Sequence, residues 1–186
     1  MTDIRNSRIL IMATHGYERS ELRYPHLELS RRGATVEIAA PEAGDIRSWD
    51  EKDWGDSASA DREIASVSAD DYDALVLPGG QINPDVLRLD EAAVALVRAF
   101  VAQGKVVAAV CHGPWLLVEA DALRGREATS YWSIRTDLRN AGARWVDKAV
   151  VADQGIVTSR CPDDLPAFVD KIEEELREGL HHRRAA

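Results

Sequence analysis

The chain has 186 residues, of which 45% are hydrophobic, and a formal net charge of -9. This length and hydrophobic content predict one globular domain over residues 1–186 and exclude an intrinsically disordered chain. The acidic balance argues against nucleic-acid and anionic-membrane partners, because both are bound mainly through Lys and Arg.

No apolar run approaches the roughly 20 residues that span a bilayer, and Met1 to Arg8 is too polar for a signal peptide. We therefore expect a soluble, cytoplasmic protein. The only cysteines are Cys111 and Cys161, which a cytosol would keep reduced. Their spacing to histidine matches no metal pattern, so we expect no metal and no cofactor.

The first third of the chain reads as a strand–helix–strand unit. Residues 8–13 form an apolar strand, residues 21–32 have helical spacing with Gly33 as a stop, and residues 35–40 form a second strand. Pro25 would lie in the first turn of the helix, where proline is tolerated. Such a unit predicts two parallel strands with a right-handed crossover.

Residues 41–68 are rich in Asp, Ser and Gly and predict short edge strands or a loop. Residues 74–77 form a core strand that ends at a Pro-Gly-Gly turn. Asp90 is placed to cap a helix that runs to about Gln103, with Gly104 after it. An apolar strand over residues 106–110 then leads through a short turn into a helix over residues 115–120.

The last third continues the alternation. Ser133 could cap a helix through Asn140, and residues 149–152 and 156–159 flank a hairpin turn. A final helix opens at Asp163 or Asp164 and runs to about Glu178, and residues 180–186 form a frayed tail. The whole pattern predicts an α/β fold, a doubly wound, mostly parallel sheet sandwiched by helices.

Cys111 occupies the most informative position. It follows the strand of residues 106–110 and is flanked by Ala109 and Gly113, which gives the pattern small-x-nucleophile-x-small of a nucleophile elbow. Side chains at such a turn lie at the carboxyl edge of a parallel sheet, where ligands bind in open α/β folds. The following helix N-terminus would favour the thiolate form of Cys111. A buried structural cysteine is the alternative.

Two neighbours could assist this thiol. His112 is adjacent in sequence and could act as a general base if a third group orients it. The backbone N–H groups of Gly79 and Gly80 could form an oxyanion hole with that of His112, provided that the strand of residues 74–77 lies beside the elbow strand. Otherwise Gly79-Gly80 is an ordinary turn and His112 merely lines the elbow.

A third segment follows the first strand. Glu18 and Glu21 stand three residues apart, so one helical turn would place both carboxylates on one face. They could equally be carboxylates that the helix dipole favours in a first turn. If Glu21 lies against the sulfur of Cys111, burial and the like charge would raise its pKa. A protonated Glu21 could then donate a hydrogen bond to a thiolate or to a sulfinate.

Together these segments resemble the PfpI-type intracellular protease family, which belongs to the superfamily of the parkinsonism-associated deglycase and the class I glutamine amidotransferases. The matching segments run in order over about residues 8–170: residues 16–25, Asp73-Ala-Leu-Val-Leu-Pro-Gly-Gly80, Val110-Cys-His-Gly-Pro114, residues 123–126, Thr129-Ser-Tyr131, Asn140-Ala-Gly142 with Trp145-Val146, and Ser159-Arg160 with Asp164-Leu165. The resemblance implies a flavodoxin-like, glutamine-amidotransferase-like fold.

The resemblance also implies roles for individual residues. Cys111 matches the family nucleophile, His112 its histidine, Glu21 the carboxylate that hydrogen-bonds the sulfur, and Glu18 a second acid of the pocket. In the PfpI-like oligomers an acid from a neighbouring subunit orients the histidine, and Asp85 matches it after one extra residue and with a shorter side chain. Tyr131 stands where the deglycase branch carries a histidine.

The leading hypothesis is a cysteine-dependent hydrolase that acts on peptides or on glyoxal-type adducts, with a role in stress protection. Its partners would be a small aldehyde or peptide substrate and further copies of the chain, as a dimer or hexamer with the active site at the subunit interface. The main alternative is an oxidative-stress protein in which Cys111 is a redox sensor. A glutamine amidotransferase is disfavoured, because residues 159–163 offer no His and Glu pair. A scaffold protein is the remaining alternative.

Overall fold

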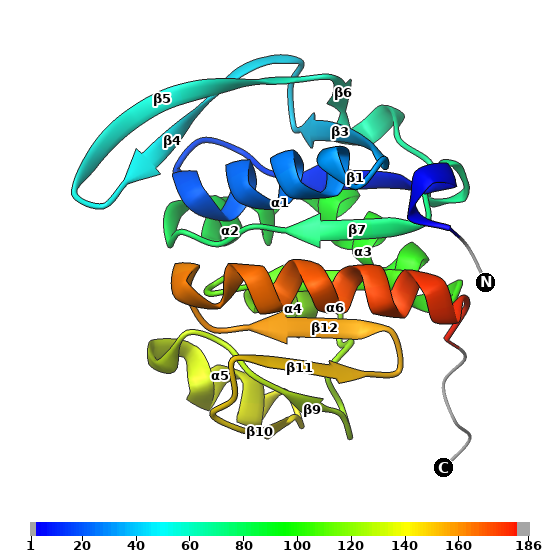
Figure 1. Ribbon diagram of the computed structural model, residues 1–186. Coiled ribbons are helices and arrows are strands. Elements are labelled where there is room, and N and C mark those ends of the chain that lie inside the picture. Colours follow the sequence, from blue (N-terminus) through cyan, green and yellow to red (C-terminus); the bar gives the residue numbers. More distant parts are fainter. Residues whose placement is uncertain (1–2, 182–186) are drawn as a thin grey trace.

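The structure, a computed structural model, describes residues 3–181 and is built on a seven-stranded sheet with the order β11-β12-β8-β7-β1-β3-β6 (Figure 1). Neighbouring strands are parallel except for β11 and β12. This arrangement confirms the predicted fold class. The strands of this sheet are β1 (Arg8–Met12), β3 (Thr35–Ala40), β6 (Arg62–Glu63), β7 (Ala74–Leu77), β8 (Val106–Val110), β11 (Val150–Asp153) and β12 (Ile156–Ser159).

Helices cover both faces of the sheet. In Figure 1, α1 and α6 lie in front of it, and α3 and α4 lie behind it. The six α-helices are α1 (Arg19–Arg31), α2 (Ile82–Leu87), α3 (Glu91–Ala102), α4 (Pro114–Glu119), α5 (Arg135–Asn140) and α6 (Leu165–Glu178). Short 3-10 turns cover Ile4–Asn6, Ile64–Ser66, Ala69–Asp71, Trp132–Ile134 and Pro162–Asp164.

The apolar residues form two cores, one on each face of the sheet. Along β1, Ile9 and Ile11 belong to the core beneath α1 and α6, whereas Leu10 and Met12 belong to the core beneath α3 and α4. Successive side chains of a strand point to opposite faces, so a strand that is covered on both sides must be apolar at every position. This is why the central strands appear in the sequence as unbroken apolar runs.

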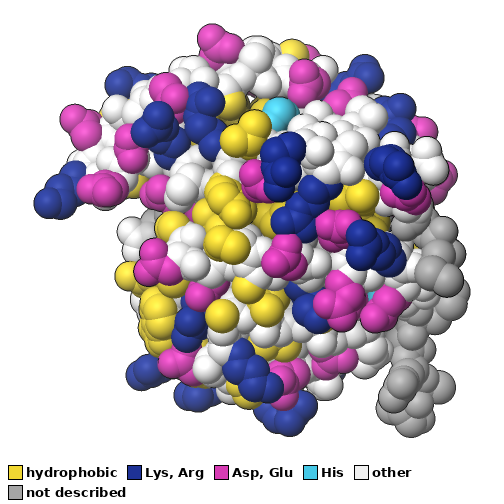
Figure 2. All heavy atoms as spheres, in the orientation of Figure 1, with side chains coloured by type: hydrophobic (Ala, Val, Ile, Leu, Met, Phe, Trp, Pro, Cys, Tyr) yellow, Lys and Arg dark blue, Asp and Glu magenta, His cyan; other side chains and the backbone are white. Residues whose placement is uncertain are grey.

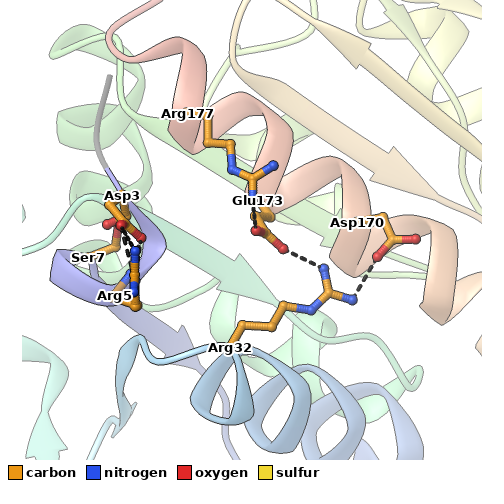
Figure 3. Close-up of polar contacts among 7 residues, drawn as sticks. All are labelled: Asp3, Arg5, Ser7, Arg32, Asp170, Glu173 and Arg177. Atoms are coloured by element: carbon orange, nitrogen blue, oxygen red, sulfur yellow. Dashed lines mark hydrogen bonds and ion pairs between the residues drawn. The ribbon is translucent and has the colours of Figure 1, made fainter.

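An ion-pair network joins α1 to α6. The Arg32 guanidinium, directly after α1, donates to Glu173 at 2.7 Å and to Asp170 at 2.6 Å, and Arg177 also pairs with Glu173 (Figure 3). Arg32 and Glu173 are largely shielded from solvent and share partners, so this network stabilises the helix pair more reliably than one exposed pair would. The network helps to fix α1, whose first turn carries Glu21.

Residues 41–68 are more regular than the sequence suggested. They contain β4 (Gly44–Asp50) and β5 (Asp53–Ala60), a long antiparallel hairpin that forms a separate three-stranded sheet with β2 (Tyr17–Glu18). Only β6, from the same segment, joins the edge of the main sheet. The hairpin lies above and to the left of the main sheet in Figure 1. A further two-stranded sheet pairs β9 (Glu127–Ala128) with β10 (Arg144–Trp145).

Several local predictions are confirmed and others are wrong. Asp90 caps α3 by accepting from the N–H groups of Ala92 and Ala93. Pro25, in contrast, lies inside α1, because the helix begins at Arg19 and not at residue 21. There it lacks the N–H that would donate to the carbonyl of Glu21.

Ser133 does not cap α5, whereas α6 has its N-cap at Asp164, as predicted. Ser133 lies within a 3-10 turn, and its hydroxyl contacts His112 instead of capping α5. Asp163 and Asp164 lie in the 3-10 turn before α6, where Asp164 pairs with Arg160. The hairpin prediction holds with a shift of one residue, since β11 starts at Val150. Most of the predicted frayed tail, residues 182–186, lies outside the described residues.

Charged side chains of both signs are interspersed over the face shown in Figure 2, with hydrophobic side chains gathered between them. Across residues 3–181, no helix combines the length and apolar character needed to cross a membrane.

Candidate active site

The site lies where two neighbouring strands end. β7 and β8 pair in parallel, with Leu77 opposite Ala109, so the turn at residues 78–80 lies beside Cys111 at the carboxyl edge of the sheet. An added Cβ at Gly79 would stand 2.8 Å from the Cβ of Cys111. The condition on which the oxyanion prediction depended is therefore met.

Cys111 has the strained backbone of a nucleophile elbow. Its φ is 62°, a left-handed conformation that costs a residue with a Cβ about 1–2 kcal/mol. Gly113 allows the close approach that this turn needs, because an added Cβ there would lie 2.4 Å from the carbonyl oxygen of Leu77. The side chain of Cys111 is 7% exposed, so the thiol faces the site from a largely buried position.

His112 connects the thiol to a serine. Its Nδ1 lies 3.2 Å from the Cys111 Sγ, and its Nε2 lies 3.1 Å from the Ser133 hydroxyl. The ring of Tyr131 stacks on the imidazole with centroids 4.9 Å apart, and Trp115 meets it edge-on. Burial lowers the pKa of His112 to about 4, so the imidazole is neutral at neutral pH. A neutral ring with its proton on Nε2, donated to Ser133, leaves Nδ1 free to accept the thiol proton.

Glu21 is fully buried against the same thiol. Its Oε2 accepts a 2.7 Å hydrogen bond from the N–H of Gly79, while its Oε1 has no hydrogen-bonding nitrogen or oxygen among the described residues. Burial raises the pKa of Glu21 to about 8, opposed by hydrogen bonding to Cys111 and the N–H of Gly79. The carboxyl is therefore mainly protonated at neutral pH and can donate to the sulfur, as the sequence suggested.

The surroundings of Cys111 contradict the expectation that the following helix N-terminus favours its thiolate form. Burial, followed by the negative charge of Glu21, raises the pKa of the thiol. The helix after the elbow, α4, has only six residues and offers little dipole to oppose this effect. The raised pKa of Cys111 and the lowered pKa of His112 both favour a neutral thiol beside a neutral imidazole in the resting site, and the helix N-terminus does not by itself produce a thiolate.

The two glycines of the turn have different roles. The N–H of Gly79 is already bonded to Glu21, so this glycine positions the acid and is not a free oxyanion donor. The N–H groups of Gly80 and His112 instead face the sulfur and stabilise negative charge there. Gly80 has a φ of 74°, and an added Cβ would lie 2.5 Å from the carbonyl oxygen of Gly16. Gly79 is thus removed from the predicted oxyanion hole, and the contribution of Gly80 and His112 to it stays a prediction.

A cavity of about 600 Å³ opens onto the thiol. All of the predicted site residues except Gly79 and Asp85 line it, namely Glu18, Glu21, Gly80, Cys111, His112 and Tyr131. The other lining residues were not predicted as site residues: Trp49, Glu51, Gln81, Ile82 and Pro162. Trp49 and Glu51 come from the β4–β5 hairpin. No sequence motif marks them, because their place depends on the pairing of β4 with β2.

Asp85 lies apart from this cluster within one copy of the chain. It is exposed on α2 and has no described contact with His112, whose side-chain partner is Ser133. Ser133 was missed as a site residue because a serine before a helix usually signals a cap. The role of Asp85 in a neighbouring subunit stays a prediction.

The fold and the elbow define an α/β protein with a cysteine at a nucleophile elbow, hydrogen-bonded to an adjacent histidine and packed against a buried glutamate. A model of the DJ-1/PfpI family matches residues 7–175, and the chain belongs to this family.

Individual proteins similar to this chain support the same family assignment. The chain is 41% identical over 170 residues to the protein named Deglycase PfpI of Pyrococcus furiosus, covering 91% of this chain and 99% of that one. It is 42% identical over 164 residues to Protein/nucleic acid deglycase 2 of Escherichia coli, covering 88% and 94%. A crystal structure from Anabaena variabilis with DJ-1/ThiJ/PfpI-like and ferritin-like domains has a TM-score of 0.87 at 35% identity, over 92% of this chain and 48% of that two-domain chain.

The raised pKa of Glu21 predicts a pH dependence of stability. Between its ordinary pKa of 4.5 and about 8, the folded chain holds a proton that the unfolded chain has lost, so the free energy of unfolding falls as pH rises. His112 has the opposite effect, but only between pH 4 and 6.5. From pH 6.5 to 8 we expect Glu21 to lower the unfolding free energy by about 2 kcal/mol. The free energy of unfolding of Glu21→Gln, measured by urea denaturation, should depend less on pH than that of the wild type.

Glu42→Gln, which changes an exposed carboxylate, is the control and should keep the wild-type profile. Matching slopes for wild type and Glu21→Gln over this pH range would contradict the assignment.

Ser133 is predicted to be a positioning residue for His112. Ser133→Ala should slow alkylation of Cys111 at pH 7 about three- to tenfold. Without the hydrogen bond to Ser133, worth about 1 kcal/mol, the imidazole proton is no longer held on Nε2, and Nδ1 is less often free to accept the thiol proton. Nitrogen NMR of His112 should show a mixture of tautomers in this variant, while the unfolding free energy changes by less than about 1.5 kcal/mol. Ser133→Thr keeps the hydroxyl and should restore the rate. An unchanged tautomer in Ser133→Ala would refute this role.

Proposed function

We propose that this protein is a cysteine-dependent hydrolase of the DJ-1/PfpI type that acts on the carbonyl carbon of glyoxal-type adducts, with peptide bonds as a second substrate class. The observation that carries the proposal is the contact of the Cys111 sulfur with His112 Nδ1 at 3.2 Å, made at a strained elbow that opens into a cavity. The names of the two deglycase relatives support it.

The neighbouring groups suit each step of this chemistry. Nδ1 of neutral His112 accepts the thiol proton, and the sulfur forms a bond to the substrate carbon while the C=O electron pair moves to oxygen. The N–H groups of Gly80 and His112, which hydrogen-bond the sulfur in the resting site, would be the donors to that oxygen. The proton on His112 then passes to the leaving group as its bond to carbon breaks and the C=O bond re-forms. Water, which gives a proton to His112, next adds to the same carbon, and the C–S bond breaks as the sulfur takes that proton back, so the product leaves and the thiol is restored. Protonated Glu21 donates to the sulfur and limits charge repulsion in the buried site.

The proposal includes an assembly. His112 has a serine in its own chain but no carboxylate partner among the described residues, and Asp85 of a second copy could supply one. Asp85 is surrounded on α2 by exposed apolar side chains, with Ile82 38%, Val86 48% and nearby Leu89 84% exposed. A cluster of this kind is typical of a protein–protein interface. We therefore propose a homo-oligomer, a dimer or hexamer, with the site at its subunit interface.

The role of Cys111 is tested by substitution. Cys111→Ser should lower turnover of methylglyoxal and of peptide substrates at least 100-fold, because the hydroxyl is a far weaker nucleophile at neutral pH. Cys161→Ser, which changes the other thiol, should keep wild-type activity. Equal turnover by Cys111→Ser and wild type would refute the proposal. Absence of turnover in wild type, together with selective sulfinic acid formation at Cys111 under mild peroxide, would favour the redox-sensor alternative.

The role of Asp85 is tested by complementation between subunits. Cys111→Ser and Asp85→Asn chains should each be impaired when alone. Co-expressed with two different affinity tags, they should recover up to about a quarter of wild-type activity in a random dimer, since each mixed pair contains one intact site. Gel filtration at micromolar concentration should show the oligomer. A fully active monomer, or the lack of any recovery in verified mixed oligomers, would exclude Asp85 as the second acid.

A further inference from the structure

A group of carboxylate and imidazole side chains lies at the opposite edge of the main sheet from Cys111. In Figure 1, β7 and β12 point to the left, whereas α6 ends on the right, at the amino ends of the strands. Helix α6 ends at Glu178, and the chain after it reaches the turn that precedes β8. Cys111 follows the other end of β8, whose five residues span roughly 16 Å. The group is therefore separate from the candidate active site.

Three side chains that can bind a metal meet at this edge. The ligand atoms of Glu175, Glu178 and His181 all lie within 4.8 Å of one another. Nε2 of His181 lies 3.5 Å from Oε2 of Glu175, which is long for a hydrogen bond. Two ligands of a tetrahedral zinc ion stand about 3.3–3.5 Å apart, because zinc bonds to nitrogen and oxygen are about 2.0–2.2 Å long. The separation of these two atoms thus suits one edge of a coordination shell.

Glu175 is a buried carboxylate without a partner outside this group. Its side chain is only 9% exposed, and its one polar contact within residues 3–181 is the long one to His181. The basic side chains Lys171 and Arg177 of the same helix form their ion pairs with other carboxylates. Burial of a carboxylate is costly unless hydrogen bonds or an opposite charge compensate it. A cation held between Glu175 and the other two side chains would supply that compensation.

The end of the helix favours the same kind of ligand. Glu175 and Glu178 stand in the last turn of α6, where the carbonyl end of the helix dipole stabilises cations and destabilises anions. Glu178 is exposed and has no hydrogen-bond or ion-pair partner among the described residues. Residues three apart on a helix lie on one face, so both carboxylates can reach one ion. Without a cation, the two acids would face the helix end and each other unfavourably.

His181 is held in place by two turns of the main sheet. Its N–H donates to the carbonyl of Gly104 at 2.6 Å, and an added Cβ at Gly155 would stand 2.9 Å from the Cβ of His181. Its Nε2 faces two oxygens of Glu175, the carboxylate and the main-chain carbonyl at 3.1 Å. A ring nitrogen carries at most one proton, whereas a cation can bind the nitrogen and the carboxylate together. The carbonyl would keep a donor, because the N–H of Gly179 also bonds to it at 3.2 Å.

We propose that Glu175, Glu178 and His181 form a binding site for a divalent transition-metal ion of the zinc type. Imidazole and carboxylate are both ligands for such ions, and water would complete the coordination shell. Mg²⁺ and Ca²⁺ suit the site less well, because they prefer oxygen ligands throughout. The ion would join the end of α6 to the turns before β8 and β12 and stabilise the fold. The expectation of no metal rested on cysteine spacing, which does not test a site built from carboxylates.

The first experiment measures zinc binding by the full chain with Cys111→Ser and Cys161→Ser, in which no thiol can take up the metal. Titration calorimetry with ZnCl₂ should show one ion per chain with a Kd below about 10 μM. ZnCl₂ at about a hundred times the measured Kd should raise the Tm by about 5–10 °C, because the ion binds the folded chain. MgCl₂ at the same concentration should leave the Tm unchanged. A Kd for zinc above about 10 μM would overturn the proposal.

The second experiment identifies the ligands by substitution in the same cysteine-free chain. Glu175→Gln and His181→Gln should each weaken zinc binding at least about tenfold, because even the loss of an outer-shell partner typically costs 10–100-fold. Glu178→Gln changes an exposed side chain, leaves the core intact and should act in the same direction. Glu174→Gln is the matched control, since Glu174 is exposed on the same helix, pairs with Lys171 and lies outside the group.

NMR of the histidine rings shows where the ion binds. The imidazole signals of His181 should shift when one equivalent of ZnCl₂ is added, whereas those of His26 on α1 should not. Unchanged affinity in both Glu178→Gln and His181→Gln, or an equal loss in Glu174→Gln, would overturn the proposal. Zinc binding that the wild type shows and the cysteine-free chain lacks would also overturn it, because the thiols would then be the ligands. An equal Tm shift with MgCl₂ would exclude His181 as a ligand and overturn the site as proposed.

Discussion

The contact between a buried carboxyl group and a strained cysteine is the constraint on which the site depends. Glu21 can lie against Cys111 because the N–H of Gly79 satisfies one of its oxygens and burial keeps a proton on the group. The positive φ of Cys111 aims the sulfur away from the strand and toward that acid. A charged carboxylate in the same place would repel a thiolate, so the raised pKa of Glu21 is what allows the two groups to be neighbours.

The surrounding fold holds these two groups from different elements. The sheet fixes Cys111 and the Gly79–Gly80 turn, because β7 and β8 are adjacent and parallel. The ion pairs between α1 and α6 fix the helix that carries Glu21. The hairpin then adds Trp49 and Glu51 as an outer wall. The nucleophile is thus held by the most buried part of the molecule, whereas the outer wall comes from the more exposed β4–β5 hairpin.

Much of the fold could be predicted from residue patterns. Unbroken apolar runs identified β1, β7 and β8 because a strand covered on both faces has no polar side. The β4–β5 hairpin was underestimated because most of its residues are polar and exposed, so they carry no strong period-two signal. The predictions for Pro25 and Ser133 were wrong for two reasons. Helix α1 starts at Arg19, earlier than local helix-start preferences indicated, and the hydroxyl of Ser133 contacts His112 instead of capping a helix.

The sequence alone determined the elbow, the identity of the thiol and the adjacent histidine, since these lie in one short segment with its own local geometry, while the acid was indicated only by the resemblance to the family. Tertiary structure decided which N–H groups remain for an oxyanion, because Gly79 bonds to Glu21 across 58 positions of sequence. It also decided that Ser133 supports His112 and that Trp49 and Glu51 face the cavity. These contacts arise from strand pairing and helix packing between distant segments, which no local pattern encodes.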